Sequence, residues 1–91
     1  MKYDVVYKNS LKKDIKLMAK RGCDLSKFEE TVNLLRAGEK LPARYKDHEL
    51  KGNYQGHREC HIEPDWLLIY KIENDILILT LTRTGAHSDL F

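Results

Sequence analysis

The sequence has no apolar run that reaches the roughly 18 residues needed for a membrane helix, and charges at Lys2 and Asp4 stand where a secretory signal would be apolar. Cysteine is scarce as well, since Cys23 and Cys60 lie far apart and neither has a C-x-x-C partner. A disulfide framework and a thiolate zinc site are therefore not expected. These absences predict a protein of the cytoplasm that does not bind a membrane.

Length and charge narrow the possibilities further. The 91 residues suffice for one domain with a modest core, so a single domain over 1–91 is expected. Residues 1–52 hold 13 Lys and Arg against 8 Asp and Glu, a net charge of +5, whereas residues 53–91 hold 3 against 6, a net charge of −3. A basic first half suits a polyanionic partner, and it suits a merely solvated surface equally well.

A strand and a helix are predicted at the N-terminus. Residues 3–7 are rich in β-branched and aromatic side chains, which favour a strand. Asn9 or Ser10 can cap a helix that ends near Arg21, where Gly22 supplies a left-handed stop. One face of this helix is apolar. A separate face carries lysines that we name the basic stripe: Lys12, Lys13, Lys16 and Lys20.

A second helix is predicted to begin at Asp24, or at the capping box Ser26–Glu29, and to end near Gly38. Its apolar residues recur at helical spacing, which is typical of a face that packs on a core. Pro42 prevents the helix from continuing, and residues 39–55 form a long polar connection without a regular pattern. Connections of this length inside a compact domain are often functional.

The second half of the chain has the pattern of strands, at 57–63, 66–70 and 76–82. Alternation in the first of them places His61 on its more polar face. Gly85 ends the last strand and leaves His87 on a short tail. The order strand–helix–helix–strand–strand–strand predicts an α+β fold in which two N-terminal helices pack on a small antiparallel sheet.

Two familiar catalytic arrangements do not fit these elements. His57 and His61 have the H-x-x-x-H spacing that suits zinc on a helix, but on a strand four residues span roughly 13 Å, too far to share one ion. A serine hydrolase of the α/β type would need a G-x-S-x-G elbow, which the sequence lacks. No metal and no cofactor are therefore expected.

What remains is a set of proton-transfer groups without a nucleophile: His48, His61, Asp65 and His87, with Arg83 as a fixed positive charge. Such a set suits RNA cleavage, because RNA carries its own nucleophile in the 2′-hydroxyl and needs only a base, an acid and a cation. Histidine can serve as acid or base near neutral pH. Each histidine can also be explained separately, as a loop, sheet-surface or tail residue, and spacing alone leaves both interpretations open.

Three motifs resemble the YafQ branch of the RelE/ParE toxin superfamily. They are YKDH-x-L-x-G from Tyr45, H-x-EPDW-x-LIYK from His61, and RTG-x-H-x-x-LF from Arg83. The resemblance extends over the length and element order of the whole chain. It implies one RelE-like α+β toxin domain with ribosome-dependent mRNA interferase activity, held inactive by an antitoxin whose C-terminal segment folds over it.

The resemblance also implies roles for single residues. His87 would be the main general acid, Arg83 would contact the scissile phosphate, and Phe91 would help to position the mRNA base or the tail itself. Three residues would complete the acid/base cluster, with the identity of the base left open: His48, His61 and Asp65. The basic stripe is predicted to dock on ribosomal RNA.

The alternative is a non-catalytic, ParE-like toxin that inhibits a protein target such as a topoisomerase. An inhibitor that works by docking has no need for three histidines and an aspartate near one edge of a sheet. A nucleic-acid-binding repressor is a third possibility, but no helix-turn-helix signal is present. The histidine set therefore favours an endoribonuclease.

Overall fold

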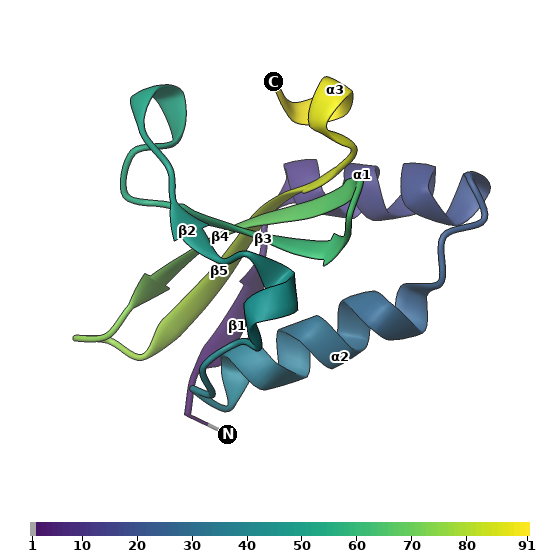
Figure 1. Ribbon diagram of the computed structural model, residues 1–91. Coiled ribbons are helices and arrows are strands. Elements are labelled where there is room, and N and C mark those ends of the chain that lie inside the picture. Colours follow the sequence, from purple (N-terminus) through teal and green to yellow (C-terminus); the bar gives the residue numbers. More distant parts are fainter. Residues whose placement is uncertain (1) are drawn as a thin grey trace.

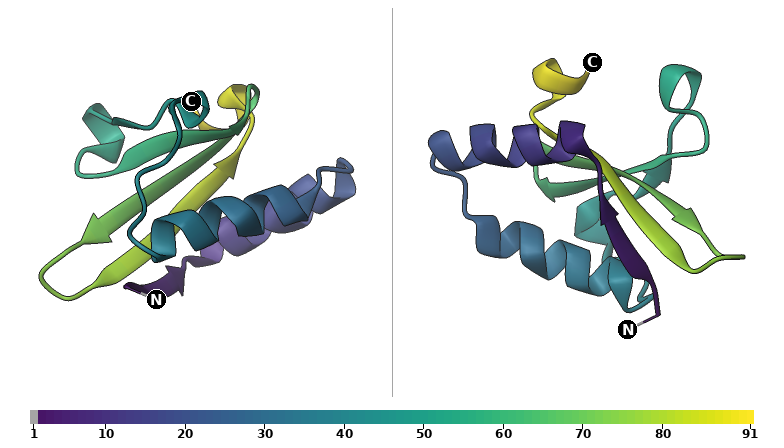
Figure 2. Two further views of the ribbon diagram at one scale, coloured as in Figure 1. Left: turned by 60° about the horizontal axis from the view of Figure 1, so that its bottom comes forward. Right: turned by 180° about the vertical axis from the view of Figure 1, so that it is seen from behind.

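The computed structural model describes residues 2–91, which form one sheet with helices on both of its faces. The strands are β1 (Asp4–Tyr7), β2 (His48–Glu49), β3 (Arg58–Glu63), β4 (Trp66–Glu73) and β5 (Ile78–Gly85). Their order is β1-β5-β4-β3-β2, with β1 parallel to β5 and the other neighbours antiparallel (Figure 1). The helices α1 (Asn9–Lys20) and α2 (Leu25–Arg36) cover one face, and the short α3 (His87–Leu90) lies over the other (Figure 2). The predicted α+β architecture is confirmed.

The two long helices begin and end close to the predicted positions. Asp24 is the N-cap of α2, because its side chain accepts a hydrogen bond from the Ser26 amide at 3.0 Å. The predicted cap of α1 was wrong, since Lys8 occupies that position and its side chain makes no capping hydrogen bond. Ser10 serves the sheet instead, and its hydroxyl donates to the Thr82 carbonyl at 2.7 Å.

The connection after α2 has more structure than its sequence pattern indicates. It contains the 3-10 helices η1 (Ala43–Tyr45) and η2 (Gly52–Tyr54), with β2 between them. The short β2 adds to the sheet edge through pairing with β3, and the Leu50 amide extends this ladder to the His57 carbonyl at 2.9 Å. The expectation of an irregular connection was therefore wrong at the segment that carries His48.

The last strand is displaced from its predicted position. Ile76 and Leu77 belong to the turn between β4 and β5, because Glu73 pairs directly with Ile78. Both side chains are exposed, and Leu77 has a left-handed backbone with φ of 53°. Their apolar character predicted a strand where the register of the hairpin requires a turn. The strand instead continues to Gly85, three residues beyond the predicted end.

The main core lies between the sheet and the two long helices. Its contributors from the helices are Leu11 and Met18 of α1 and Phe28, Val32 and Leu35 of α2. Burial raises the pKa of the Cys60 thiol in this core, which makes it a packing residue rather than a reactive one. A second cluster on the opposite face joins Leu67 and Ile69 of β4 to Leu90 of α3. In residues 2–91 no helix is long and apolar enough to span a membrane.

Helix α1 replaces β1 along the second half of β5. The Lys8 amide donates to the Leu81 carbonyl at 3.1 Å, and the Ser10 hydroxyl reaches the next carbonyl of the strand. Further along, a carboxylate oxygen of Asp14 accepts from the Thr84 amide at 3.1 Å. Polar groups at the start of the helix thus satisfy a strand edge that would otherwise be left without partners.

Asp14→Ala should destabilise the protein by about 1–3 kcal/mol, because the buried Thr84 amide and the Arg83 guanidinium would both lose their acceptor. Urea unfolding of purified protein measures the change. Asp4→Ala removes an exposed carboxylate from β1 and is the matched control, with little expected effect. Equal destabilisation of the two variants would contradict this role of Asp14.

Candidate active site

Two of the predicted acid/base residues meet on the sheet face that α3 covers. The rings of His48 on β2 and His61 on β3 lie 6.5 Å apart between centroids. Between them stands the carboxylate of Glu59, whose Oε1 atom is 3.5 Å from His48 Nε2 and 3.6 Å from His61 Nε2. We call these three side chains the histidine–glutamate group.

Glu59 was missed by the sequence analysis as a site residue. Alternation along β3 placed it on the polar face together with His61, and the structure agrees about the face. Its side chain is nevertheless only 7% exposed. The sequence could have indicated Glu59, because residues two apart on a strand share a face, and Glu59 is two residues before His61.

The hydrogen bonds of the two imidazoles fix which nitrogen is free. His48 Nδ1 lies 2.7 Å from the Lys46 carbonyl, and His61 Nδ1 lies 3.2 Å from the Pro64 carbonyl. A carbonyl oxygen only accepts, so each Nδ1 atom carries a hydrogen. The Nε2 atoms, both directed at Glu59, are therefore the atoms that give or take a proton.

Asp47 holds the segment that carries His48 against the sheet. Its carboxylate accepts from the Tyr70 hydroxyl at 2.5 Å and from Arg58 Nη2 at 3.1 Å. Burial, together with the hydrogen bond to Asp47, raises the pKa of Tyr70, so the phenol stays a donor. Tyr45 is buried in the main core. Two residues of the YKDH motif thus orient the histidine that follows them.

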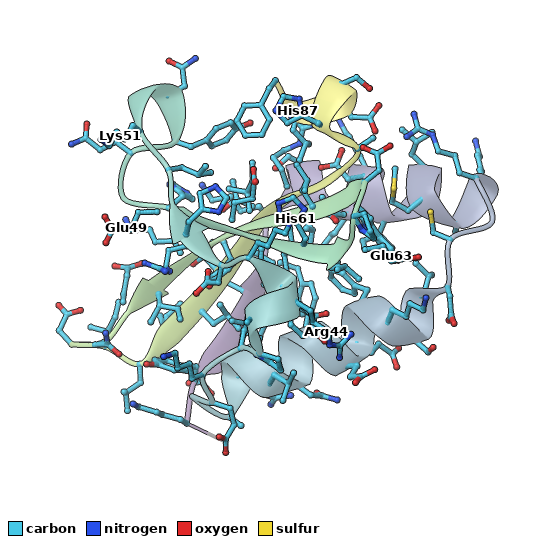
Figure 3. All side chains as sticks on the ribbon, in the orientation of Figure 1. Arg44, Glu49, Lys51, His61, Glu63 and His87 are labelled. Atoms are coloured by element: carbon cyan, nitrogen blue, oxygen red, sulfur yellow. The ribbon has the colours of Figure 1, made fainter. Side chains whose placement is uncertain are left out.

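His87 belongs to an aromatic group on the same face. It is the first residue of α3 and is exposed, and its ring lies 5.0 Å from that of Phe91. Phe91 in turn packs edge-on against Tyr54 of η2, with centroids 5.7 Å apart. Figure 3 shows His87 beside α3 and His61 above the sheet, so the two groups come from separate elements.

The position of α3 depends on Asp89. Its carboxylate accepts from the Ala86 amide at 2.8 Å and from Arg21 Nη1 at 2.6 Å. Arg21 follows the end of α1, so this ion pair joins the tail to the first helix. A β-carbon at Gly85 would lie 3.0 Å from the Asp89 carboxylate, which explains glycine at this position.

Arg83 and Asp65 occupy different surroundings. Arg83 Nε donates to Asp14 at 2.6 Å, which raises the pKa of the guanidinium, and its side chain is 30% exposed. Asp65 is exposed in the turn between β3 and β4 and makes no hydrogen bond to a histidine in the described residues. Their assigned roles therefore remain predictions. Trp66 is core, as predicted, and donates to Thr84 Oγ1 at 2.9 Å.

Within residues 2–91, no three His, Cys, Asp or Glu side chains are arranged to hold a metal ion. The chemistry that the described side chains can supply themselves is proton transfer at the Nε2 atoms and charge stabilisation by a guanidinium. Both are groups that a phosphodiester substrate with an internal hydroxyl would use.

Asp89 gives a prediction about pH. Hydrogen bonds from Arg21 and Ala86 lower the pKa of Asp89 from 3.8 to about 2. A carboxylate with a lowered pKa stabilises the folded state above its unfolded pKa, and this contribution is lost as pH falls through the folded value. The melting temperature of Asp89→Asn should therefore lie below that of wild type by a constant gap from pH 7 to about pH 5, and the gap should close toward pH 2.

Asp75→Asn, in the exposed turn between β4 and β5, is the control for this series. If the difference in melting temperature between Asp89→Asn and wild type stays the same down to pH 2, the charge of the Asp89 carboxylate and its ion pair with Arg21 do not stabilise the folded state.

Comparison with known proteins shows the family of this chain. Residues 3–91 match the family model described as a bacterial toxin of type II toxin-antitoxin system, YafQ. The mRNA interferase toxin YafQ of Escherichia coli strain K12 is 44% identical over 89 residues, which are 97% of this chain and 95% of that protein.

Solved structures are similar over the same extent. The crystal structure of YafQ from E. coli strain BL21(DE3) has a TM-score of 0.92 and 41% identity, and covers 98% of both chains. YafQ in the crystal structure of the E. coli DinJ-YafQ toxin-antitoxin complex has a TM-score of 0.89 and 42% identity, over 100% of this chain and 99% of that one. The resemblance inferred from the three motifs is confirmed, and the chain belongs to the YafQ family of bacterial type II toxins.

Proposed function

We propose that this protein is an mRNA interferase, the toxin of a type II pair, which cleaves mRNA in the ribosomal A site without a metal in the chemical step. Residues 1–91 would act as a single toxin domain. The observation that carries the proposal is the histidine–glutamate group, which gathers two imidazole Nε2 atoms around one carboxylate on the face that also holds His87. The name of the E. coli relative, an mRNA interferase toxin, supports it.

The chemistry follows from what RNA supplies. A base removes the proton of the 2′-hydroxyl, the 2′-oxygen attacks the adjacent phosphorus, and the bond to the 5′-oxygen breaks as an acid protonates that oxygen. The products are a 2′,3′-cyclic phosphate and a 5′-hydroxyl. His87 is the acid in this proposal, and Arg83 stabilises the charge on the phosphorus centre through the exposed part of its guanidinium.

The base is proposed to be His48 or His61 rather than Asp65. Each histidine has its Nδ1 atom next to a carbonyl and its Nε2 atom directed at Glu59, whereas Asp65 lies in a turn. Once Nε2 takes a proton, Glu59 stands ready to accept a hydrogen bond from it. Glu59 would thus be a positioning residue that acts through the histidines.

Partners follow from the same proposal. An enzyme that cuts the mRNA of its own cell must be held inactive, and the DinJ-YafQ complex of E. coli supports a cognate antitoxin for this chain. Ribosomes and mRNA place the activity in the cytoplasm. The four lysines of the basic stripe are exposed on α1, and none of them forms an ion pair within residues 2–91, so all are free to meet ribosomal RNA.

The activity is tested with ribosomes that carry a defined mRNA. His87→Ala should lower the cleavage rate by on the order of 10²-fold, while its melting temperature stays at the wild-type value because the side chain is exposed. Ser88→Ala, the next residue of α3, is the control and should cleave normally. Wild-type fragments should end in a 2′,3′-cyclic phosphate and a 5′-hydroxyl, and fragments with 5′-phosphates would indicate attack by water instead.

Ribosome docking is tested separately. Replacing all four lysines of the basic stripe by Gln should weaken ribosome binding. The slope of the logarithm of the binding constant against the logarithm of the salt concentration should become less steep by roughly 0.7 to 0.9 for each phosphate that the variant no longer neutralises. Slow cleavage of free RNA should stay nearly unchanged, because no residue of the stripe belongs to the active site. Lys40→Gln, in the connection after α2, together with Lys71→Gln, on β4, is the control. If the stripe variant binds ribosomes with unchanged affinity and salt dependence, the basic stripe is only a solvated face and does not dock on ribosomal RNA.

A further inference from the structure

A hollow of about 240 Å³ opens beside His61, between η1 and the end of β3. Its walls come from two segments that are separate in the sequence, and they are Arg44, Lys46, His61, Ile62, Glu63 and Pro64. Figure 3 shows three of these, Arg44, His61 and Glu63, around the end of β3. Pockets for small-molecule ligands are usually larger, roughly 300–1,000 Å³, so this hollow suits one part of a longer ligand.

The charge of the hollow is positive. Arg44 and Lys46 are exposed, and neither forms an ion pair within the described residues. The one acidic side chain of the wall is Glu63, whose Oε2 atom lies 3.4 Å from Lys27 Nζ of α2. Lys27 partly neutralises Glu63, so the two cations of the wall are left without a counter-ion.

One of the two cations rests on a buried residue, and the other lies two residues further along the chain. The Arg44 guanidinium lies over the ring of Tyr45 at 4.6 Å from its centroid and donates to the Tyr45 hydroxyl at 3.3 Å. Tyr45 is buried, so it is a rigid platform for the arginine. Lys46 has a left-handed backbone with φ of 49°, and its carbonyl is the one that holds His48 Nδ1. The hollow is therefore built into the same segment as the active site.

We propose that this hollow binds a backbone phosphate of the mRNA, next to the linkage that is cut, with Arg44 and Lys46 as its ligands. This inference rests on the proposed function. Guanidinium and ammonium groups are the usual protein ligands of phosphate. Pro64, which is exposed, supplies an apolar part of the wall on which the attached sugar can lie.

His61 explains why the subsite matters for cleavage. Its ring is both a wall of the hollow and a member of the histidine–glutamate group. A strand held by one phosphate in the hollow presents a neighbouring linkage at His61 Nε2. The subsite thus supplies orientation, which is the part of catalysis that proton transfer alone cannot provide.

Substitutions at the wall should therefore change binding in opposite directions. On mRNA-programmed ribosomes, Arg44→Gln and Lys46→Gln should each lower kcat/KM by about tenfold, because mRNA without this contact is bound less tightly and held in a less productive orientation. Arg44→Lys keeps the charge and should recover part of the affinity. Glu63→Gln removes the acid from the wall and should lower KM. Lys40→Gln, on the same connection but outside the hollow, is the matched control.

A second measurement distinguishes mRNA phosphate from ribosomal phosphate. Neutral methylphosphonate linkages are placed one at a time on either side of the cut site. At the linkage that occupies the hollow, the neutral group should impair wild type as much as Arg44→Gln does, and should add nothing in the Arg44→Gln variant. If every position impairs wild type and variant equally, Arg44 does not bind mRNA and the subsite proposal is wrong.

Failure of the two proposals can be told apart. Normal wild-type cleavage with no effect of the Arg44, Lys46 and Glu63 variants beyond that of Lys40→Gln would reject the subsite alone. Absence of wild-type cleavage would reject the proposed function, and the subsite is then judged by fluorescence anisotropy with a short 2′-deoxy-substituted RNA. Weaker binding of that RNA to Arg44→Gln supports the subsite, and equal binding rejects it.

Discussion

One carboxylate, that of Asp14, joins the first helix to the last strand and supports the end of the strand that leads to His87. It accepts from the Thr84 amide and from two nitrogens of Arg83, and it is almost fully buried. Removal of such an acceptor leaves buried donors without partners, which is costly. Thr84 in turn accepts from Trp66 Nε1 and donates to the Leu67 carbonyl, so β4 and β5 are fastened at the same point. The end of β5, and with it the tail that carries His87, is held by α1.

The sequence was informative about the two long helices, which depend largely on local signals. Both long helices have apolar spacing and a glycine after their last turn, and Asp24 caps α2 as one of the two predicted starts. Strand β2 could not be predicted, because only pairing with β3 makes a strand of its two residues. Burial of Glu59 was hidden for a similar reason, since η2 and α3 cover that face from distant parts of the chain. The motifs identified the histidines in the sequence. Their contact with Glu59 could be seen only in the folded structure.

The active face is assembled from two halves with different supports. The histidine–glutamate group sits on paired strands, where the ladder and Asp47 hold it. The other half is α3, whose four residues are too few for a helix that is stable by itself. Leu90 packs on β4 and Asp89 binds Arg21, so a short helix is kept in place by interactions with the rest of the domain. His87, the proposed proton donor, is thus on the half that is more easily displaced.

The position of β5 in the sheet bears on how the protein is made. This strand leaves the ribosome after the other four, yet it lies between β1 and β4 and pairs with both. Until residues 78–85 emerge, β1 has no neighbour to pair with, and the longest-range pairing of the fold forms last. The helix that carries His87 follows β5 in the chain. During its own translation, the growing chain therefore lacks both a complete sheet and His87 until residues 78–87 have been made.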